Sequence, residues 1–206
     1  MPKFLTKVEI EAEIHKVKDW CRTEFQKNPD LLNRFRVIIY QNGEFIRVFG
    51  QNFKLLFFRE QRKGLTGKLT KENYVELRIP TDADEYLVQE AIGKLLSRIF
   101  SSYFLKDIVD RVNYFNRTYF QEPIQNIRLK NNQSNWGSCS SKRNINLSSR
   151  LLFAPTEVLD YVIVHELAHL KEMNHSPRFW KIVYDVMPDY KEKEKWLSEH
   201  GGTLKY

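Results

Sequence analysis

Hydrophobic positions in the N-terminal part of the chain change their period once, and the change separates a helix from strands. Apolar residues recur at helical spacing among glutamates and lysines over 6–27, which predicts a helix that stops at 28–30. The stretch 35–60 is rich in β-branched and aromatic residues instead. Within it, Asn42-Gly43 predicts the turn of a β-hairpin.

The middle of the chain has the pattern of one strand followed by a long helical region. "NYVELRIP" over 73–80 alternates apolar and polar residues and predicts a strand. Apolar residues then line one helical face over 82–120, with Thr81 or Asp82 as the N-cap and a break expected near 101–102.

The C-terminal part returns to strands and then to helices. A strand is expected over 124–130, and a short hairpin over 133–149, where the polar residues 140–144 predict the turn. A helix begins at Pro155-Thr156, and two more are expected over 177–186 and 190–199.

The order of these elements shows little regular alternation of strand and helix, which favours an α+β fold class. We expect an N-terminal helical extension over 1–34 and one domain over 35–206. That domain contains mixed or antiparallel strands over 35–80, a long central helical region over 82–120 and a C-terminal part over 123–206 with the β-hairpin and the last helices.

Composition narrows the class of protein. A chain of 206 residues with 42% apolar residues can bury a core without disulfides or a structural metal. Its two cysteines, Cys21 and Cys139, are too few for a disulfide framework and indicate a reducing compartment. The N-terminus resembles no signal peptide, and no apolar run is long enough to span a bilayer. We therefore expect a soluble cytoplasmic protein without a membrane partner, and the oligomeric state stays open.

Basic residues exceed acidic ones by seven, with 33 Lys and Arg against 26 Asp and Glu. A positive net charge suits nucleic acid or an anionic surface. No single stretch concentrates the charge, however, and no nucleic-acid motif is present. We favour an ordinary solvated surface and keep nucleic acid as an alternative partner.

The strongest chemical signal lies in "YVIVHELAHL" (161–170). His165 and His169 are four residues apart, so a helix places both on one face, where each nitrogen can reach one ion at about 2 Å. Glu166 is rotated by about 100° and is better placed to contact a water on that ion than to bind it. This His-Glu-x-x-His pattern is typical of zinc peptidases.

A third ligand is needed for a tetrahedral site with one open position, and His175 is the natural candidate. Asn174 before it can adopt the left-handed conformation that ends helices, and Ser176-Pro177 after it predicts the start of the next helix. A tight link would then turn His175 back toward the first pair. Acidic residues of the last helix are the alternative third ligand, namely Glu192 or Glu194.

Two segments of the chain resemble a known family. "WGSCSSKRNINL" and "RLLFAPTEVLDYVIVHELAHLKEMNHSPRFW" are similar to the YgjP-like zinc metallopeptidases, which are related to the SprT-like peptidases. The resemblance is dense over 136–180, follows only the order of strands and helices over 36–135, and does not extend to the N-terminal helix. The chain departs from the family pattern at Asn135, where a basic residue is common, and at 148–149, where an Asn-Trp pair is common.

The resemblance implies zincin-like helices that hold one Zn²⁺ ion through His165, His169 and His175, with Glu166 as the catalytic base. The reaction implied is hydrolysis of peptide bonds by a metal-activated water, with a peptide or protein as the substrate. The sequence offers three candidates for stabilising the oxyanion and does not distinguish among them: Tyr161, Arg178 and Tyr184.

The other chemical groups near the motif have ordinary interpretations. We expect Cys139 to be a buried structural thiol, Phe179 and Trp180 to pack the two helices together, and Glu172 to be a solvated acid at a helix end. His15 and His200 lie in charged segments and are expected on the surface.

Two questions stay open. The hairpin over 133–149 either pairs with an extended substrate or only stabilises the domain through Trp136. The protein as a whole has three possible functions. It cleaves peptides, or it associates with nucleic acid and its peptidase either acts there or is inactive, or it binds a metal without turnover.

Overall fold

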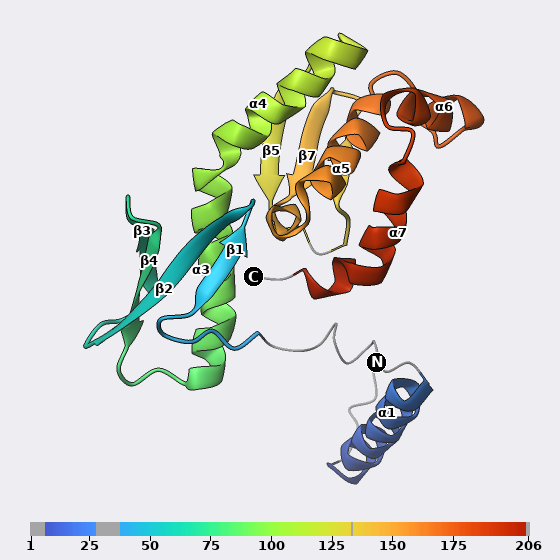
Figure 1. The fold of residues 1–206 in the computed structure, drawn as a ribbon. Coiled ribbons are helices and arrows are strands. Elements are labelled where there is room, and N and C mark those ends of the chain that lie inside the picture. Colours follow the sequence, from blue (N-terminus) through green and yellow to red (C-terminus); the bar gives the residue numbers. More distant parts are fainter. Residues whose placement is uncertain (1–6, 28–37, 133, 205–206) are drawn as a thin grey trace. The chain divides into compact units, whose positions relative to one another are not determined.

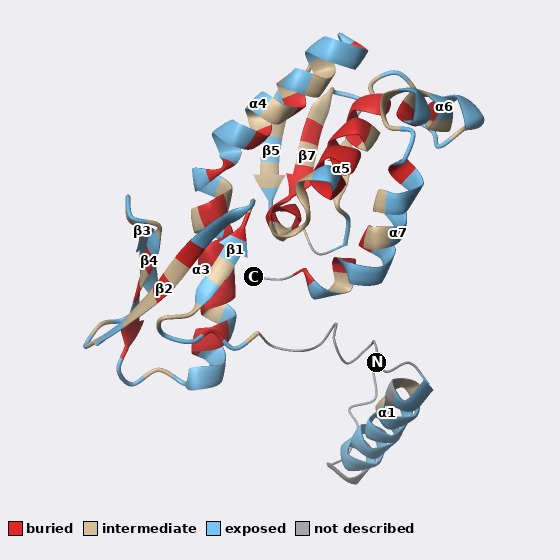
Figure 2. Cartoon of the chain, in the orientation of Figure 1, coloured by how far each residue is buried: buried red, intermediate tan, exposed pale blue. Residues whose placement is uncertain are grey.

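The computed structural model describes residues 7–27, 38–132 and 134–204. The chain divides into two compact units, Met1–Arg36 and Val37–Tyr206. In the first unit, helix α1 (Lys7–Lys27) confirms the helix expected over 6–27. Most of this helix is exposed (Figure 2), and the exposed residues include the apolar Ile10, Ile14 and Trp20. The stop predicted at 28–30 lies outside the described residues, and the assignment of 1–34 as an extension stays a prediction.

The second unit begins with a mixed four-stranded sheet (Figure 1). Its strands are β1 (Phe45–Val48), β2 (Gln51–Glu60), β3 (Thr66–Leu69) and β4 (Tyr74–Pro80), in the order β1-β2-β4-β3. The β1–β2 and β3–β4 pairs are antiparallel, whereas β2 and β4 are parallel. The strand expected over 73–80 is therefore confirmed, and the short β3 was not predicted.

The chain reverses between β1 and β2 at Phe49 and Gly50, which have φ values of 47° and 75°. The prediction of a hairpin turn at 42–43 is wrong. The Phe49 N–H donates to the carbonyl oxygen of Leu152 at 2.6 Å, and the Phe49 ring packs edge-on against Phe104 at 5.2 Å between centroids. These contacts with distant parts of the chain fix the reversal there, even though a phenylalanine at positive φ is locally unfavourable.

Asn42 and Gly43 form a turn that braces β2 instead of joining two strands. The Gly43 N–H donates to the carbonyl oxygen of Leu55 at 2.8 Å, and the Asn42 side-chain oxygen accepts from the Phe57 N–H at 2.9 Å. Residues 38–40, at the end of the first expected strand, are not in a strand, and 35–37 lie outside the described residues.

The long helical region consists of α3 (Glu85–Tyr103), α4 (Leu105–Phe115) and the π-helix η1 (Asn116–Phe120). The N-cap is Asp84, whose side chain accepts from the Leu87 N–H at 3.0 Å, so the prediction of Thr81 or Asp82 is wrong. The break lies at Phe104 and not at 101–102, because the fully buried Phe104 ring packs among Phe49, Phe53 and Phe100.

A three-stranded sheet carries the C-terminal part. Its strands are β5 (Asn126–Lys130), β6 (Gly137–Cys139) and β7 (Asn144–Ser148), in the order β5-β7-β6. The antiparallel pairing of β6 with β7 confirms the predicted hairpin, and β5 runs parallel to β7. Strand β6 is therefore at an edge of the sheet.

The remaining elements are η2 (Ser149–Phe153), α5 (Thr156–Ala168), α6 (Pro177–Val186), α7 (Tyr190–His200) and η3 (Gly201–Thr203). Helix α5 contacts β6, β7, α4, α6 and α7 and is mostly buried (Figure 2). A two-pronged ion pair between Arg111 of α4 and Asp160 of α5 ties these helices together and raises the pKa of Arg111. Among the described residues, no helix combines the length and apolar character needed to cross a bilayer.

Candidate metal centre

Helix α5 places the first histidine pair through its own packing. Val162, Ile163 and Val164 are buried against neighbouring elements, which fixes the rotation of the helix about its axis. His165 then extends from the opposite edge of the buried face and is half-buried, and His169 follows directly after the last helical residue. The spacing of four residues brings the two imidazoles together edge to face, with 5.1 Å between ring centroids.

The segment after α5 turns the chain back so that His175 faces this pair. Ser176 caps α6, with its side chain accepting from the Phe179 N–H at 3.3 Å and Pro177 as the first helical residue, as predicted. The expected left-handed conformation of Asn174 is wrong, because Asn174 has no positive φ. Successive turns over 167–172 carry the reversal instead.

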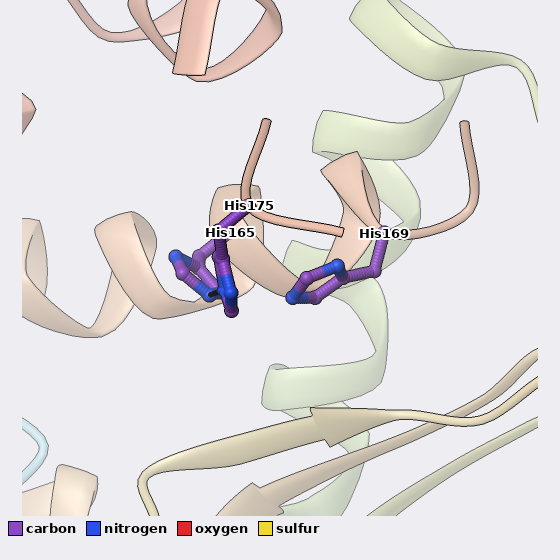
Figure 3. A group of neighbouring side chains, drawn as sticks. All are labelled: His165, His169 and His175. Carbon is purple, nitrogen blue, oxygen red and sulfur yellow. Dashed lines mark hydrogen bonds between the residues drawn. The ribbon is translucent and has the colours of Figure 1, made fainter. Parts of the chain in front are cut away.

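The three histidine side chains lie close together (Figure 3). One candidate ligand atom from each of His165, His169 and His175 lies within 4.8 Å of the other two. The Nε2 atoms of His165 and His175 are 3.1 Å apart. Two nitrogens bound to one tetrahedral zinc at about 2.0–2.1 Å would be about 3.3–3.4 Å apart, so the spacing of the His165 and His175 nitrogens is close to that of such an ion's ligands. Neither Glu192 nor Glu194 joins the cluster of described residues that could hold a metal.

Burial favours the neutral form of His165 and His169, which is the form in which a histidine binds a metal. Burial lowers the pKa of His165 to about 4, with a further lowering from charge on His169 and His175. Burial also lowers the pKa of His169, whose Nδ1 lies 3.2 Å from the carbonyl oxygen of Glu172. That contact orients the His169 ring so that its other nitrogen faces the cluster. The buried Nδ1 of His165 has no hydrogen-bond partner among the described residues.

An aromatic floor supports the three rings. The Phe179 side chain is fully buried, and its centroid lies 4.9, 4.5 and 4.8 Å from those of His165, His169 and His175. Trp180 stacks on His175 with 5.8 Å between centroids. Both aromatic residues therefore pack against the cluster as well as between the helices, and they restrict the positions that the imidazoles can take.

Glu166 is a buried carboxyl group beside the cluster. Only 5% of its surface is exposed, and burial raises its pKa to about 8, against the backbone N–H of Cys139, which lowers it. The side chain lies tightly against Gly137 of β6. A β-carbon at Gly137 would fall within 2.7 Å of both Cγ and Cδ of Glu166, which is closer than any normal contact. Sequence reasoning missed this requirement, although the "WGSC" motif contains the glycine.

A cavity of about 370 Å³ opens beside His165 and Glu166. Its lining residues come from β6 and the segment before it, from α5 and from α7: Asn135, Trp136, Gly137, Tyr161, Val162, His165, Glu166, Glu194, Leu197 and Ser198. Among the three oxyanion candidates, Tyr161 lines this cavity, whereas Arg178 and Tyr184 are exposed on α6.

Trp136, which forms one wall of this cavity, is held in place by the C-terminal turn. The Arg150 guanidinium lies over the Trp136 ring at 4.2 Å and donates at 2.7 Å to each of the carbonyl oxygens of Gly201 and Leu204. A β-carbon at Gly201 would come within 2.5 Å of the indole, so the backbone there packs directly on the ring. Trp136 thus stabilises the packing of the C-terminal turn and also lines the cavity.

Cys139 and Glu172 are two other polar residues near the cluster whose roles were predicted from the sequence. Cys139 is half-buried, and burial raises the pKa of its thiol to about 11, which keeps it protonated as a structural thiol would be. Glu172 contributes through its backbone carbonyl oxygen, which contacts His169. A side-chain pattern cannot reveal such a contact.

Comparison with known proteins gives a family and distant relatives. A family model described as "YgjP-like, metallopeptidase domain" matches residues 1–200. That match includes α1, so the expectation that the resemblance stops before the N-terminal helix is wrong. A UTP pyrophosphatase of Escherichia coli (strain K12) is 26% identical over 95 residues, which are 44% of this chain and 57% of the relative. The chain thus matches little more than half of that relative's length.

Two solved structures have partial similarity, and both are metallopeptidase zymogens. Abylysin of Pyrococcus abyssi is 26% identical with a TM-score of 0.40, and the match covers 45% of this chain and 93% of abylysin. Jannalysin of Methanocaldococcus jannaschii is 27% identical with a TM-score of 0.40, covering 45% of this chain and 94% of jannalysin.

Proposed function

The chain belongs to the YgjP-like family of metallopeptidase domains, and on that premise we propose that it is a zinc-dependent peptidase of the cytoplasm. His165, His169 and His175 would hold one ion. The observation that carries the proposal is the convergence of three imidazoles beside a buried carboxyl group at the edge of a cavity. Three histidines plus an open position is a ligand set that catalytic zinc sites use.

Zinc bound there would supply Lewis acidity, which lowers the pKa of a water ligand to about 7 and polarises the scissile carbonyl. The protein's own groups would do the rest. Glu166 accepts the proton of the attacking water and later donates it to the leaving amine. The Tyr161 hydroxyl lines the cavity and would donate a hydrogen bond to the developing oxyanion.

The contact between Glu166 and Gly137 predicts an unusual sensitivity to a single methyl group. Gly137→Ala is expected to reduce kcat by about tenfold to a hundredfold, because the added β-carbon must push the carboxyl group from its position. Bound metal should be unchanged, since the three atoms nearest to the added β-carbon all belong to Glu166, which is not part of the histidine cluster. Initial rates and metal content, measured on the same preparation, would check this.

Gly64→Ala is the matched control, because a β-carbon there meets nothing within 4 Å. It should leave both quantities unchanged. Wild-type activity in Gly137→Ala would show that the position of the Glu166 carboxyl group does not matter for the reaction.

Hydrolysis of a nucleoside triphosphate is the second candidate, because a relative with 26% identity is named a UTP pyrophosphatase. The same cluster could in principle activate water for attack on phosphorus. The cavity argues against it, since no lysine or arginine is among its lining residues and two glutamates are. Association with nucleic acid, considered from the net charge, stays a prediction.

Removal of the metal should separate these candidates. Treatment with a chelator is expected to abolish cleavage of casein, and about one equivalent of zinc per chain should restore it. Metal content by mass spectrometry, casein cleavage and pyrophosphate release from UTP should be followed on the same samples. Casein cleavage by metal-free protein would contradict the proposal, and zinc-dependent hydrolysis of UTP without cleavage of any protein would favour the second candidate.

A further inference from the structure

We propose that the cavity beside His165 and Glu166 binds a lysine or arginine side chain of the peptide substrate, next to the bond that is cleaved, and that Glu194 selects it. This inference rests on the proposed peptidase function. It adds a substrate preference that the histidine cluster itself does not determine.

The shape of the cavity suits a long side chain with an apolar stem. Trp136, Val162 and Leu197 supply apolar walls, and the volume of about 370 Å³ leaves room for a side chain larger than alanine or serine. Because His165 and Glu166 line the same cavity, a residue that enters it has its backbone close to the catalytic groups. Lysine and arginine place their methylene groups along such walls while keeping the charged end in a polar region.

The charge of the cavity is negative, although the chain as a whole carries a net charge of +7. Glu194 of α7 lines the cavity, and among the described residues it forms no ion pair, in contrast to its neighbours Glu192 and Glu199. An incoming cation would therefore meet a carboxylate that no lysine or arginine of the described chain neutralises.

Arg150, the arginine that packs on the Trp136 wall, does not neutralise the Glu194 carboxylate within the cavity. Arg150 covers the Trp136 ring and donates to two backbone carbonyl oxygens, and it is not among the lining residues. An acidic side chain in the cavity would lose its hydration and find no lysine or arginine among the lining residues, with Glu194 nearby to repel it. Neutral side chains would bind through the apolar walls alone.

The test uses wild-type, zinc-loaded full-length protein and a series of peptides that differ at one central position. That position carries Lys, Arg, Gln, Met or Glu in a host of small neutral residues, and cleavage sites are mapped by mass spectrometry. The expected result is cleavage next to the central residue, with kcat/KM for Lys and Arg roughly fivefold or more above that for Gln and Met, and lowest for Glu.

Glu194→Gln should reduce the preference for Lys over Gln to roughly one, and Asn135→Arg, which adds a cation at the same cavity, should reduce it as well. Glu199→Gln is the control, because Glu199 lies on the same helix but outside the cavity and pairs with Lys195. It should keep the wild-type preference.

The outcomes distinguish the two levels of the proposal. Cleavage of all peptides without preference, or a preference that survives Glu194→Gln, overturns the assignment of the cavity and leaves the peptidase function standing. Absence of cleavage of any peptide and of casein by zinc-loaded protein overturns the peptidase function itself. Binding of the intact peptides to zinc-loaded Glu166→Gln, measured by calorimetry, should show the same order Lys and Arg above Gln, and an equal affinity for Glu would contradict it.

Discussion

Glu166→Gln is expected to reduce hydrolysis by about a hundredfold to ten-thousandfold while the protein keeps its metal. Glutamine has nearly the same shape as glutamate but cannot accept the proton of the attacking water. The substitution leaves all three histidines in place, and Glu166 is not part of their cluster. The buried position tolerates an amide, because the backbone N–H of Cys139 can donate to its oxygen. Initial rates on casein and metal content per chain are the two measurements.

The size of this effect follows from the isolation of the carboxyl group. Glu166 is buried and lies against β6, so bulk water has limited access and cannot easily replace the missing base. Glu172→Gln offers a control on the same stretch of chain, since Glu172 contacts His169 only through its backbone. It should retain activity and metal. A Glu166→Gln protein that cleaves as fast as wild type would eliminate Glu166 as the general base.

His175→Ala is expected to lower the affinity for zinc by more than about a hundredfold, and to abolish hydrolysis at ordinary zinc concentrations. Loss of a residue that merely orients a ligand lowers metal affinity by about tenfold to a hundredfold, and loss of a ligand itself should lower it further. His175 is exposed and lies in a short link between helices. The core contacts that the substitution removes are therefore those of its ring with Phe179 and Trp180. Competition with a chromophoric chelator would measure the affinity.

His15→Ala is the matched control, because His15 is an exposed histidine of α1 outside the cluster. It should bind zinc as the wild type does. The experiment also tests the alternative third ligand that the sequence left open. If His175→Ala keeps its zinc and Glu194→Gln loses it, the acid of α7 is the ligand and the histidine is not.

The parts of the site that could be predicted are those that depend on short stretches of sequence. The spacing of His165 and His169 sets their geometry within one helix, and Ser176-Pro177 starts the next helix within a few residues of them. Local rules of capping and periodicity are sufficient for both features. The convergence of His175 on the pair follows from the same short link.

The parts that could not be predicted depend on contacts between distant residues. Phe49 adopts a positive φ because of Leu152 and Phe104, about a hundred and about fifty-five residues away respectively, and this outweighs the turn signal of Asn42-Gly43. The parallel pairing of β2 with β4 similarly has no local signature. The fit of Gly137 against Glu166 arises only when the sheet edge and α5 come together.

The turn at 201–204 has a practical consequence for anyone who edits this protein. Its carbonyl oxygens anchor Arg150, and Gly201 lies flat on the indole that forms a cavity wall. Trimming the chain back to the end of α7 would remove both supports at once. This last turn is therefore a support for the cavity wall, and truncated versions of the chain should retain it.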